Sequence, residues 1–240
     1  MSILITGGTG GLGSVLVKRC LDLNLSVVLC HRGRKMSIVR SLRKMFSKKG
    51  VDFTDILFNF TDNSIAFDSM IHNINIDSAV LCHGKNVTGN ILEIGKEELD
   101  DSYKINYFSS FFLLQALVKK WKNEGKKNCS VTYISSVASE TVSPNELAYH
   151  AAKRAMEGSM KSFARAFSED GYRFNVISPG LMNTKMGNKT LTDRPEILTR
   201  IPLKQLTKVD DIVSMIIFLI QSSSMTGQNI HINSGRYMNL

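Results

Sequence analysis

The sequence has few cysteines, and none lies close to another. The four are Cys20, Cys30, Cys82 and Cys129, and no C-x-x-C pair occurs. This spacing argues against a bound metal and against a disulfide framework. It is typical of a reducing compartment, so we expect a cytoplasmic protein without a metal site.

Long apolar runs are also absent. The longest strongly apolar run, residues 212–220, is too short to cross a bilayer, which takes about 20 residues. The start of the chain reaches glycines too soon for a signal peptide. We therefore expect no membrane association.

Acidic residues are outnumbered, with 21 Asp and Glu against 30 Lys and Arg, for a net charge of +9. Residues 32–49 contain eight Lys and Arg and no acid, and a second basic cluster spans residues 119–127. Such clusters are usually solvated helix faces, but they also attract anions such as a phosphorylated cofactor or an acidic carrier of the substrate. No recognition motif accompanies them, so we expect no nucleic-acid partner.

Apolar runs of strand length alternate with amphipathic stretches along the whole chain. The apolar runs are 2–6, 25–30, 53–60, 77–82, 129–135, 173–178 and 229–233. Helical spacing covers 11–23, 36–49, 63–73, 97–123, 145–169 and 208–221. Such alternation predicts a parallel sheet with helices on both faces. We predict an α/β fold of about seven mostly parallel strands, in a single domain over residues 1–240.

One stretch, residues 181–206, lacks a regular pattern and carries Pro195 and Pro202. A long irregular stretch in a compact domain is usually functional and often a lid. The alternative is a variable surface excursion.

A glycine-rich turn separates the first predicted strand from the first predicted helix. Glycines at such a turn let the backbone approach a pyrophosphate, which then lies at the helix N-terminus. The sequence therefore predicts a dinucleotide site formed by Thr6, Gly7, Thr9, Gly11, Leu12 and Gly13.

The end of the second predicted strand favours NADPH over NADH. NAD-binding proteins usually place an Asp or Glu here to hold the ribose 2′-hydroxyl. This chain has His31, Arg32 and Arg34 instead. Such groups suit a 2′-phosphate through charge-assisted hydrogen bonds. An exposed basic turn is the alternative interpretation.

Tyr149 and Lys153 lie four residues apart in the helical stretch 145–169. Residues at this spacing project from one helix face. A phenol normally titrates near a pKa of about 10, and an ammonium fixed beside it lowers that pKa. The pair therefore has the chemistry of a general acid/base, although the same spacing also arises by chance in many helices.

Together these motifs resemble the short-chain dehydrogenase/reductase family over nearly the whole chain. The glycine turn is similar to its T-G-x-x-x-G-x-G, and Tyr149 with Lys153 is similar to its Y-x-x-x-K. Three more of its motifs follow in the same order and spacing: Asn106, Ser136 at a strand end, and Pro179-Gly180 followed by Thr184. The resemblance implies a Rossmann fold and an oxidoreductase.

The resemblance also implies a role for each of these residues. Tyr149 would protonate the substrate oxygen as hydride arrives, and Lys153 would lower the pKa of Tyr149 and hold the nicotinamide ribose. Ser136 would hydrogen-bond the carbonyl, and Asn106 would hold a water that links Lys153 to solvent. The nicotinamide end would contact Pro179, Gly180 and Thr184. Singly, each residue also has a structural explanation, as a cap, a turn or a helix residue.

The chain departs from the family pattern at three places, one of which is the last turn, where Asn233-Ser234-Gly235 replaces a usual double glycine. The family usually has N-N-A-G after its fourth strand, whereas this chain has Leu81-Cys82-His83-Gly84, so only Gly84 remains as a cofactor contact. After the third strand, Asn59-Phe60 stands where an Asp often contacts adenine. An asparagine can still hydrogen-bond the adenine amine.

Within the family, the chain most resembles 3-oxoacyl-[acyl-carrier-protein] reductases, through its length and its Tyr-Met tail at residues 237–238. This resemblance implies an acyl thioester substrate, possibly on an acidic acyl carrier protein. Lys126 and Lys127 are candidate contacts with that carrier protein. A solvated helix end explains those lysines equally well.

Two other functions stay open. One is a short-chain reductase acting on a free alcohol, a sugar or a steroid-like ketone; the other is a dinucleotide-binding subunit without catalysis. The resemblance also implies a homotetramer packed through the helices at 97–123 and 145–169. Phe108, Phe111 and Phe112 suit such a second buried face, or belong to the core.

Overall fold

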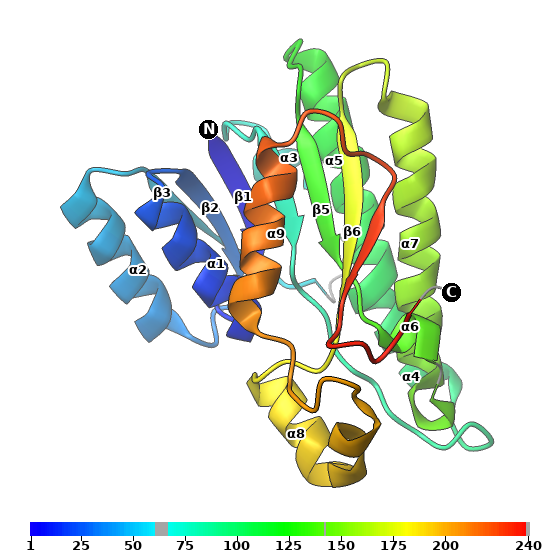
Figure 1. Ribbon diagram of the computed structural model, residues 1–240. Helices are drawn as coiled ribbons and strands as arrows, with labels where there is room; N and C mark the ends of the chain where they lie inside the picture. Colours follow the sequence, from blue (N-terminus) through cyan, green and yellow to red (C-terminus); the bar gives the residue numbers. More distant parts are fainter. Residues whose placement is uncertain (61–66, 142, 239–240) are drawn as a thin grey trace.

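The computed structural model describes residues 1–60, 67–141 and 143–238 (Figure 1). Within them, seven strands form one sheet in the order β3-β2-β1-β4-β5-β6-β7, and every neighbouring pair is parallel. The strands are β1 (Ser2–Thr6), β2 (Ser26–His31), β3 (Phe53–Leu57), β4 (Ser78–Leu81), β5 (Ser130–Ile134), β6 (Arg173–Pro179) and β7 (Asn229–Ile232). This is the predicted Rossmann-type fold, with a sheet that is entirely parallel.

Helices cover both faces of the sheet (Figure 1). One face carries α1 (Gly11–Asp22), α2 (Met36–Lys49) and α9 (Val209–Gln221); the other carries α3 (Phe67–Ile71), α5 (Ser109–Asn123) and α7 (Leu147–Phe167). Successive strand residues alternate between the two cores: Ile3 and Ile5 lie in the first and Leu4 in the second. Because both faces are buried, the strands are continuously apolar, which made them visible in the sequence.

The helix predicted at 97–123 is interrupted. It consists of α4 (Lys96–Tyr103), a π-helical turn η1 (Lys104–Phe108) and α5. A π turn inserts a residue into the helix and often marks a functional position. Here it carries Asn106.

The stretch 181–206 is largely helical, so the expectation of an irregular segment is wrong. It contains α8 (Lys185–Asp193) and η3 (Pro195–Arg200). Thr184 caps α8 by accepting a hydrogen bond from the Gly187 N–H at 3.2 Å. Pro195 starts the next turn, since proline tolerates the first position of a helix but not its interior. Figure 1 places α8 beyond the carboxyl ends of the strands.

The remaining helical elements are short. They are α6 (Ala138–Thr141) and η2 (Pro144–Glu146), which leads directly into α7. Of the helix predicted at 63–73, residues 63–66 lie outside the described part of the chain, and α3 forms the rest. No helix in the described residues is long and apolar enough to cross a membrane.

Candidate active site

The predicted site residues meet at the carboxyl ends of the strands. The order in which successive strands join the sheet reverses between β1 and β4, and ligands of such sheets bind in the crevice outside this point. A cavity of about 910 Å³ lies here, lined by Arg32, Arg34, Gly84 and Lys85 among others. A smaller cavity of about 100 Å³ is lined by Ser136, Tyr149, Pro179, Gly180 and Thr184 among others. The larger cavity has room for a dinucleotide, and the smaller holds the candidate catalytic groups.

The glycine turn has the geometry of a phosphate cradle. Gly7 has a φ of 66°, in the left-handed region that favours glycine, and its carbonyl accepts a hydrogen bond from the Gly10 N–H at 2.9 Å. A methyl group on Gly13 would lie 2.5 Å from the Gly7 oxygen, so the start of α1 presses directly on the turn. The N-terminus of α1 has no side-chain cap and no acid in its first turn. Its backbone N–H groups therefore suit the pyrophosphate of a dinucleotide.

Of the basic residues after β2, the structure directs His31 away from the cleft. Its imidazole is buried; Nε2 lies 3.1 Å from Asp55 Oδ2, and Nδ1 accepts a hydrogen bond from the Gly33 N–H at 3.1 Å. The predicted contact of His31 with a 2′-phosphate is therefore wrong, because both ring nitrogens already have partners. Arg32 and Arg34 do line the larger cavity. Lys35, which the sequence analysis did not single out, donates to the Thr9 carbonyl oxygen at 2.9 Å.

Phe60 and His83 explain one departure from the family pattern. The Phe60 ring is buried and stacks on the His83 ring, with 4.0 Å between centroids, so it is a core residue and not an adenine contact. Asn59, after β3, is exposed and remains the candidate for adenine contact.

His83 joins β1 to α5 across the end of β4. Its Nδ1 lies 2.7 Å from Thr6 Oγ1, and its Nε2 lies 2.8 Å from Ser109 Oγ. Ser109 donates its own proton to the Ile105 carbonyl, so Nε2 of His83 carries the hydrogen and Nδ1 accepts from Thr6. Burial lowers the pKa of His83 to about 3, which keeps the ring neutral. The histidine is thus a structural link.

Gly84 lies where a side chain would be crowded. An added methyl group would be 3.0 Å from Asn106 Oδ1 and 3.3 Å from Lys153 Nζ. The glycine after β4 therefore lets the backbone run directly past two of the candidate catalytic residues.

The four candidate catalytic residues come from three elements. Ser136 follows β5, Tyr149 and Lys153 lie near the start of α7, and Asn106 lies on η1. Asn106 is fully buried and Lys153 is 3% exposed. Ser136 and Tyr149 line the smaller cavity together.

The electrostatics of Tyr149 differ from the expectation. Burial raises the pKa of Tyr149 to about 12, while the Ser136 hydroxyl acts in the opposite direction. Lys153 Nζ lies 5.8 Å from the centre of the Tyr149 ring and donates to the Ile134 carbonyl oxygen at 2.8 Å. The predicted lowering of the tyrosine pKa is therefore wrong for this arrangement, because burial dominates. Burial also lowers the pKa of Lys153, to about 7.

Asn106 ties the segment after β4 to the π turn. Its Nδ2 donates to the Lys85 carbonyl at 2.9 Å, and its Oδ1 accepts from the Lys85 N–H at 3.0 Å. Its backbone carbonyl accepts a hydrogen bond from the Tyr133 hydroxyl at 2.9 Å. This carbonyl is the group that the predicted water would bind.

A buried glutamate supports the Ser136 loop. Glu157 Oε1 accepts from Ser135 Oγ at 2.5 Å and from Ser139 Oγ at 2.7 Å, on either side of Ser136. Glu157 stands four residues after Lys153, on the α7 face that also carries Tyr149. That continued spacing is a signal in the sequence for Glu157, which was not among the predicted site residues.

A second buried glutamate connects the smaller cavity to the segment after β6. Glu146 accepts from Arg194 at 2.9 Å and from Asn86 Nδ2 at 2.9 Å. Burial opposes its ionisation, yet the nearby His150 ring, with Nε2 3.6 Å away, the hydrogen bond from Asn86 and the charge of Arg194 lower its pKa to about 2. Local sequence gave no signal for this contact, since its partners are far apart along the chain.

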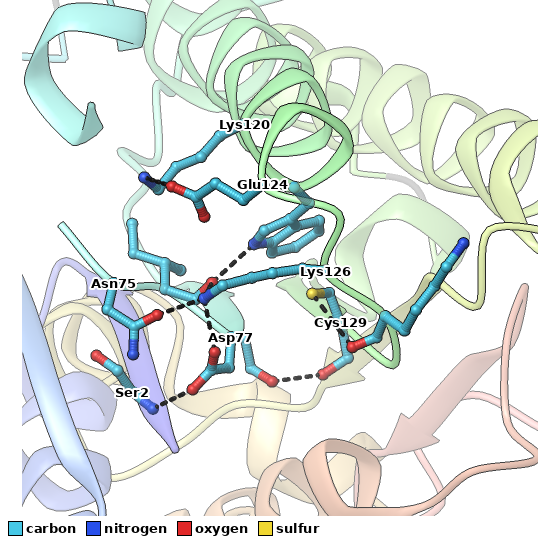
Figure 2. Close-up of polar contacts among 12 residues, drawn as sticks. Ser2, Asn75, Asp77, Lys120, Glu124, Lys126 and Cys129 are labelled. Atoms are coloured by element: carbon cyan, nitrogen blue, oxygen red, sulfur yellow. Dashed lines mark hydrogen bonds and ion pairs between the residues drawn. The ribbon is translucent and has the colours of Figure 1, made fainter. Parts of the chain in front are cut away.

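The structure corrects the suggestion that Lys126 contacts a carrier protein. Figure 2 shows its ammonium directed at Asp77 and Asn75. The distance to Asp77 Oδ1 is 2.7 Å and that to the Ile76 carbonyl oxygen is 2.8 Å. Lys127 is exposed, but it precedes β5, whereas Ser136 follows it. A five-residue strand spans about 16 Å. Both lysines therefore lie at the amino ends of the strands, whereas the cavities lie at the carboxyl ends.

Metal ligation has no candidate in residues 1–60, 67–141 and 143–238. No group of three His, Cys, Asp or Glu side chains comes together there. The four cysteines are unpaired, and burial raises the pKa of Cys82, the one nearest the cavities, to about 12.

The chain is similar to known reductases over almost its full length. A family model described as enoyl-(acyl carrier protein) reductase matches residues 7–236. A 3-oxoacyl-[acyl-carrier-protein] reductase, FabG of Buchnera aphidicola, is 25% identical over 98% of this chain and 96% of its own length. The same enzyme of Salmonella typhimurium is 26% identical, also over 98% and 96%.

Solved structures show the same fold. An actinorhodin polyketide ketoreductase with NADPH has a TM-score of 0.88 at 19% identity, over 98% of this chain and 96% of the other. ElxO with NADP bound has a TM-score of 0.87 at 20% identity, over 98% of both chains.

Proposed function

The chain belongs to the short-chain dehydrogenase/reductase family of oxidoreductases, and from this premise we propose that it reduces a 3-oxoacyl thioester to the 3-hydroxyacyl form with NADPH. The observation that carries the proposal is the smaller cavity, where Ser136 and Tyr149 face one volume beside Pro179 and Gly180. The FabG relatives are named for this reaction.

The protein supplies the proton and the orientation. When bound on the glycine turn, NADPH supplies the hydride. Tyr149, with its pKa raised to about 12, is protonated at neutral pH and acts as the general acid toward the carbonyl oxygen. Ser136 donates a hydrogen bond to the same oxygen and holds it within reach of Tyr149.

Lys153 replaces the proton that Tyr149 gives up. A pKa of about 7 lets Lys153 gain and lose a proton near neutrality. Its charged form, drawn toward the phenolate that forms on Tyr149, stabilises the product of the proton transfer. We propose that a water bound to the Asn106 carbonyl returns the proton from solvent.

The preference for NADPH rests on Arg32 and Arg34, which line the larger cavity after β2. No Asp or Glu follows β2 before Asp52, so a ribose 2′-hydroxyl lacks its usual carboxylate acceptor. Two guanidinium groups suit a phosphate instead.

The experiment that tests this function follows NADPH and NADH oxidation with a panel of 3-oxoacyl thioesters and free ketones. We expect turnover with NADPH and thioesters. Tyr149→Phe should lower kcat by at least about 10²-fold, as expected for lost acid–base catalysis, while NADPH binding persists. A Tyr149→Phe protein with a near-normal rate would refute the mechanism. Turnover of free ketones alone would favour a reductase that acts on a free alcohol, a sugar or a steroid-like ketone. NADPH binding without any turnover would favour a dinucleotide-binding subunit without catalysis.

We also propose that copies of the chain associate through η1 and α5. Phe108 is 44% exposed and Phe112 is 49% exposed, and the two rings lie 6.4 Å apart. Such neighbouring exposed aromatic rings suit a second buried face. Light scattering should give a tetramer; a monomer at micromolar concentration would contradict this. A cytosolic location, proposed from the four free cysteines, is compatible with this assembly.

A further inference from the structure

One arginine in the smaller cavity has no acidic partner. Arg194 and Arg236 both line this cavity with Ser136 and Tyr149, and Glu146 is the one carboxylate among its described lining residues. Glu146 already accepts a hydrogen bond from Arg194 at 2.9 Å. No ion pair or side-chain hydrogen bond of Arg236 occurs within the described part of the chain. Two arginines against one glutamate leave one positive charge uncompensated beside the catalytic tyrosine.

A fixed turn carries Arg236 into this position. Ser234 has a φ of 55°, a left-handed conformation that is uncommon for a residue with a side chain. The Asn233 side chain spans the turn, donating from Nδ2 to the Tyr237 carbonyl at 3.0 Å. The Leu203 N–H donates to the Ser234 carbonyl at 3.2 Å, which joins the turn to the segment after η3. The backbone that carries Arg236 is thus held by these two hydrogen bonds.

The surroundings of Arg236 favour an added negative charge. Partial burial lowers its pKa; the Glu146 carboxylate acts in the opposite direction, and the charges of Arg194 and Arg200 lower the pKa further. A guanidinium remains charged nonetheless. A carboxylate beside the guanidinium would compensate the repulsion from Arg194 and Arg200.

We propose that Arg236 binds a carboxylate carried by the acyl part of the substrate, with two parallel N–H to oxygen hydrogen bonds. The inference rests on the proposed function and narrows its substrate class to 3-oxoacyl thioesters whose acyl end is acidic. The smaller cavity, about 100 Å³, is much smaller than the neighbouring cavity of about 910 Å³. We therefore expect a short chain between the reacting carbonyl and the carboxylate.

The thioester end of the substrate would lie outside the smaller cavity. Asn86, Glu146, Met186 and Arg194 line both cavities, so the two volumes adjoin. The acyl end would occupy the smaller cavity while the thioester side leaves through the larger one.

The test compares two substrates that differ by one methyl group: a 3-oxoglutaryl thioester and its methyl ester at the far carboxyl. We expect the protein to prefer the acid by about 10- to 100-fold in kcat/KM, the range for hydrogen bonds to a charged group. Arg236→Met should bring this ratio close to one. Arg165→Met, an exposed arginine near the far end of α7, removes the same charge and should keep the ratio.

A binding measurement separates this inference from the function it rests on. Calorimetry with glutarate and monomethyl glutarate on the NADP⁺-loaded protein needs no turnover. Tighter binding of glutarate that Arg236→Met abolishes would support the carboxylate site even if no thioester is reduced. Equal reduction of both thioesters, or glutarate binding that Arg236→Met leaves intact, would overturn the carboxylate site. Neither result would contradict the proposed reductase activity. Weaker NADPH binding by Arg236→Met with an unchanged ratio would assign the arginine to the cofactor and also overturn the carboxylate site.

Discussion

Lys153 Nζ lies over the Tyr133 ring, 4.6 Å from its centre, so the aromatic face attracts the ammonium. The hydroxyl of the same tyrosine donates to the Asn106 carbonyl at 2.9 Å. One buried side chain of β5 therefore holds both the lysine and the π turn that carries the asparagine.

Replacing Tyr133 should separate these two contacts. Tyr133→Phe keeps the ring and removes the hydroxyl, so we expect kcat to fall by about 3- to 10-fold, the effect of one neutral hydrogen bond. Tyr133→Leu also removes the ring, which favours the charged lysine. The pH at which activity is lost through Lys153 should therefore move downward in Tyr133→Leu and not in Tyr133→Phe. Identical pH profiles of kcat for the two variants would contradict a role for the ring.

The pH dependence of reduction should be set by Lys153. Its pKa, lowered to about 7 by burial, means that the ammonium loses its proton as pH rises through neutrality. Tyr149, with a pKa of about 12, stays protonated over the same range. We expect kcat/KM for ketone reduction to fall above a pH of about 7. In Lys153→Arg the rate should be lower, but the fall should move to much higher pH because a guanidinium keeps its charge.

A profile of Lys153→Arg that still falls near neutrality would assign this titration to another group. Measuring NADPH binding at each pH serves as the control, since it separates loss of the cofactor from loss of the proton.

The parts of the fold that the sequence revealed are those set by local pattern. Strands covered on both faces are apolar throughout, so β1 and β5 could be predicted from their apolar runs. The turn after β1 could be predicted from its glycines. The bounds of α2 match the predicted range of residues 36–49. These features need no knowledge of a distant partner.

The parts that it did not reveal depend on residues far apart in the chain. His31 looked like a phosphate ligand because Asp55, which holds its ring, lies on another strand. Tyr149 and Lys153 lie on one face of α7, as their spacing predicted. Burial nevertheless raises the pKa of Tyr149, and the Lys153 ammonium donates to the Ile134 carbonyl oxygen. Arg236 lay in a tail whose path back to the site no local pattern describes.

Removing Glu157 should disturb the serine loop without touching substrate. In Glu157→Ala, Ser135 and Ser139 lose their common acceptor, so Ser136 between them is held less firmly. We expect kcat to fall by about 10-fold or more, in line with one or two lost hydrogen bonds to a charge, while the Kd for NADPH changes little. Glu157→Gln retains an acceptor oxygen and should recover part of the loss. Equal effects of the two variants on kcat would indicate a merely structural role.

The neutral His83 should make the protein sensitive to acid. Its pKa is about 3 in the folded chain and about 6.5 when unfolded, so between these values the unfolded state binds more protons. Stability should therefore be fully present above pH of about 6.5 and fall on acidification, by up to about 1.4 kcal/mol per pH unit from this residue. His83→Gln retains hydrogen-bonding groups toward Thr6 and Ser109 but does not titrate. Urea unfolding at several pH values should show a shallower acid loss in this variant, even if it is less stable at neutral pH. Parallel pH profiles of the free energy of unfolding would mean that the buried ring is not what titrates.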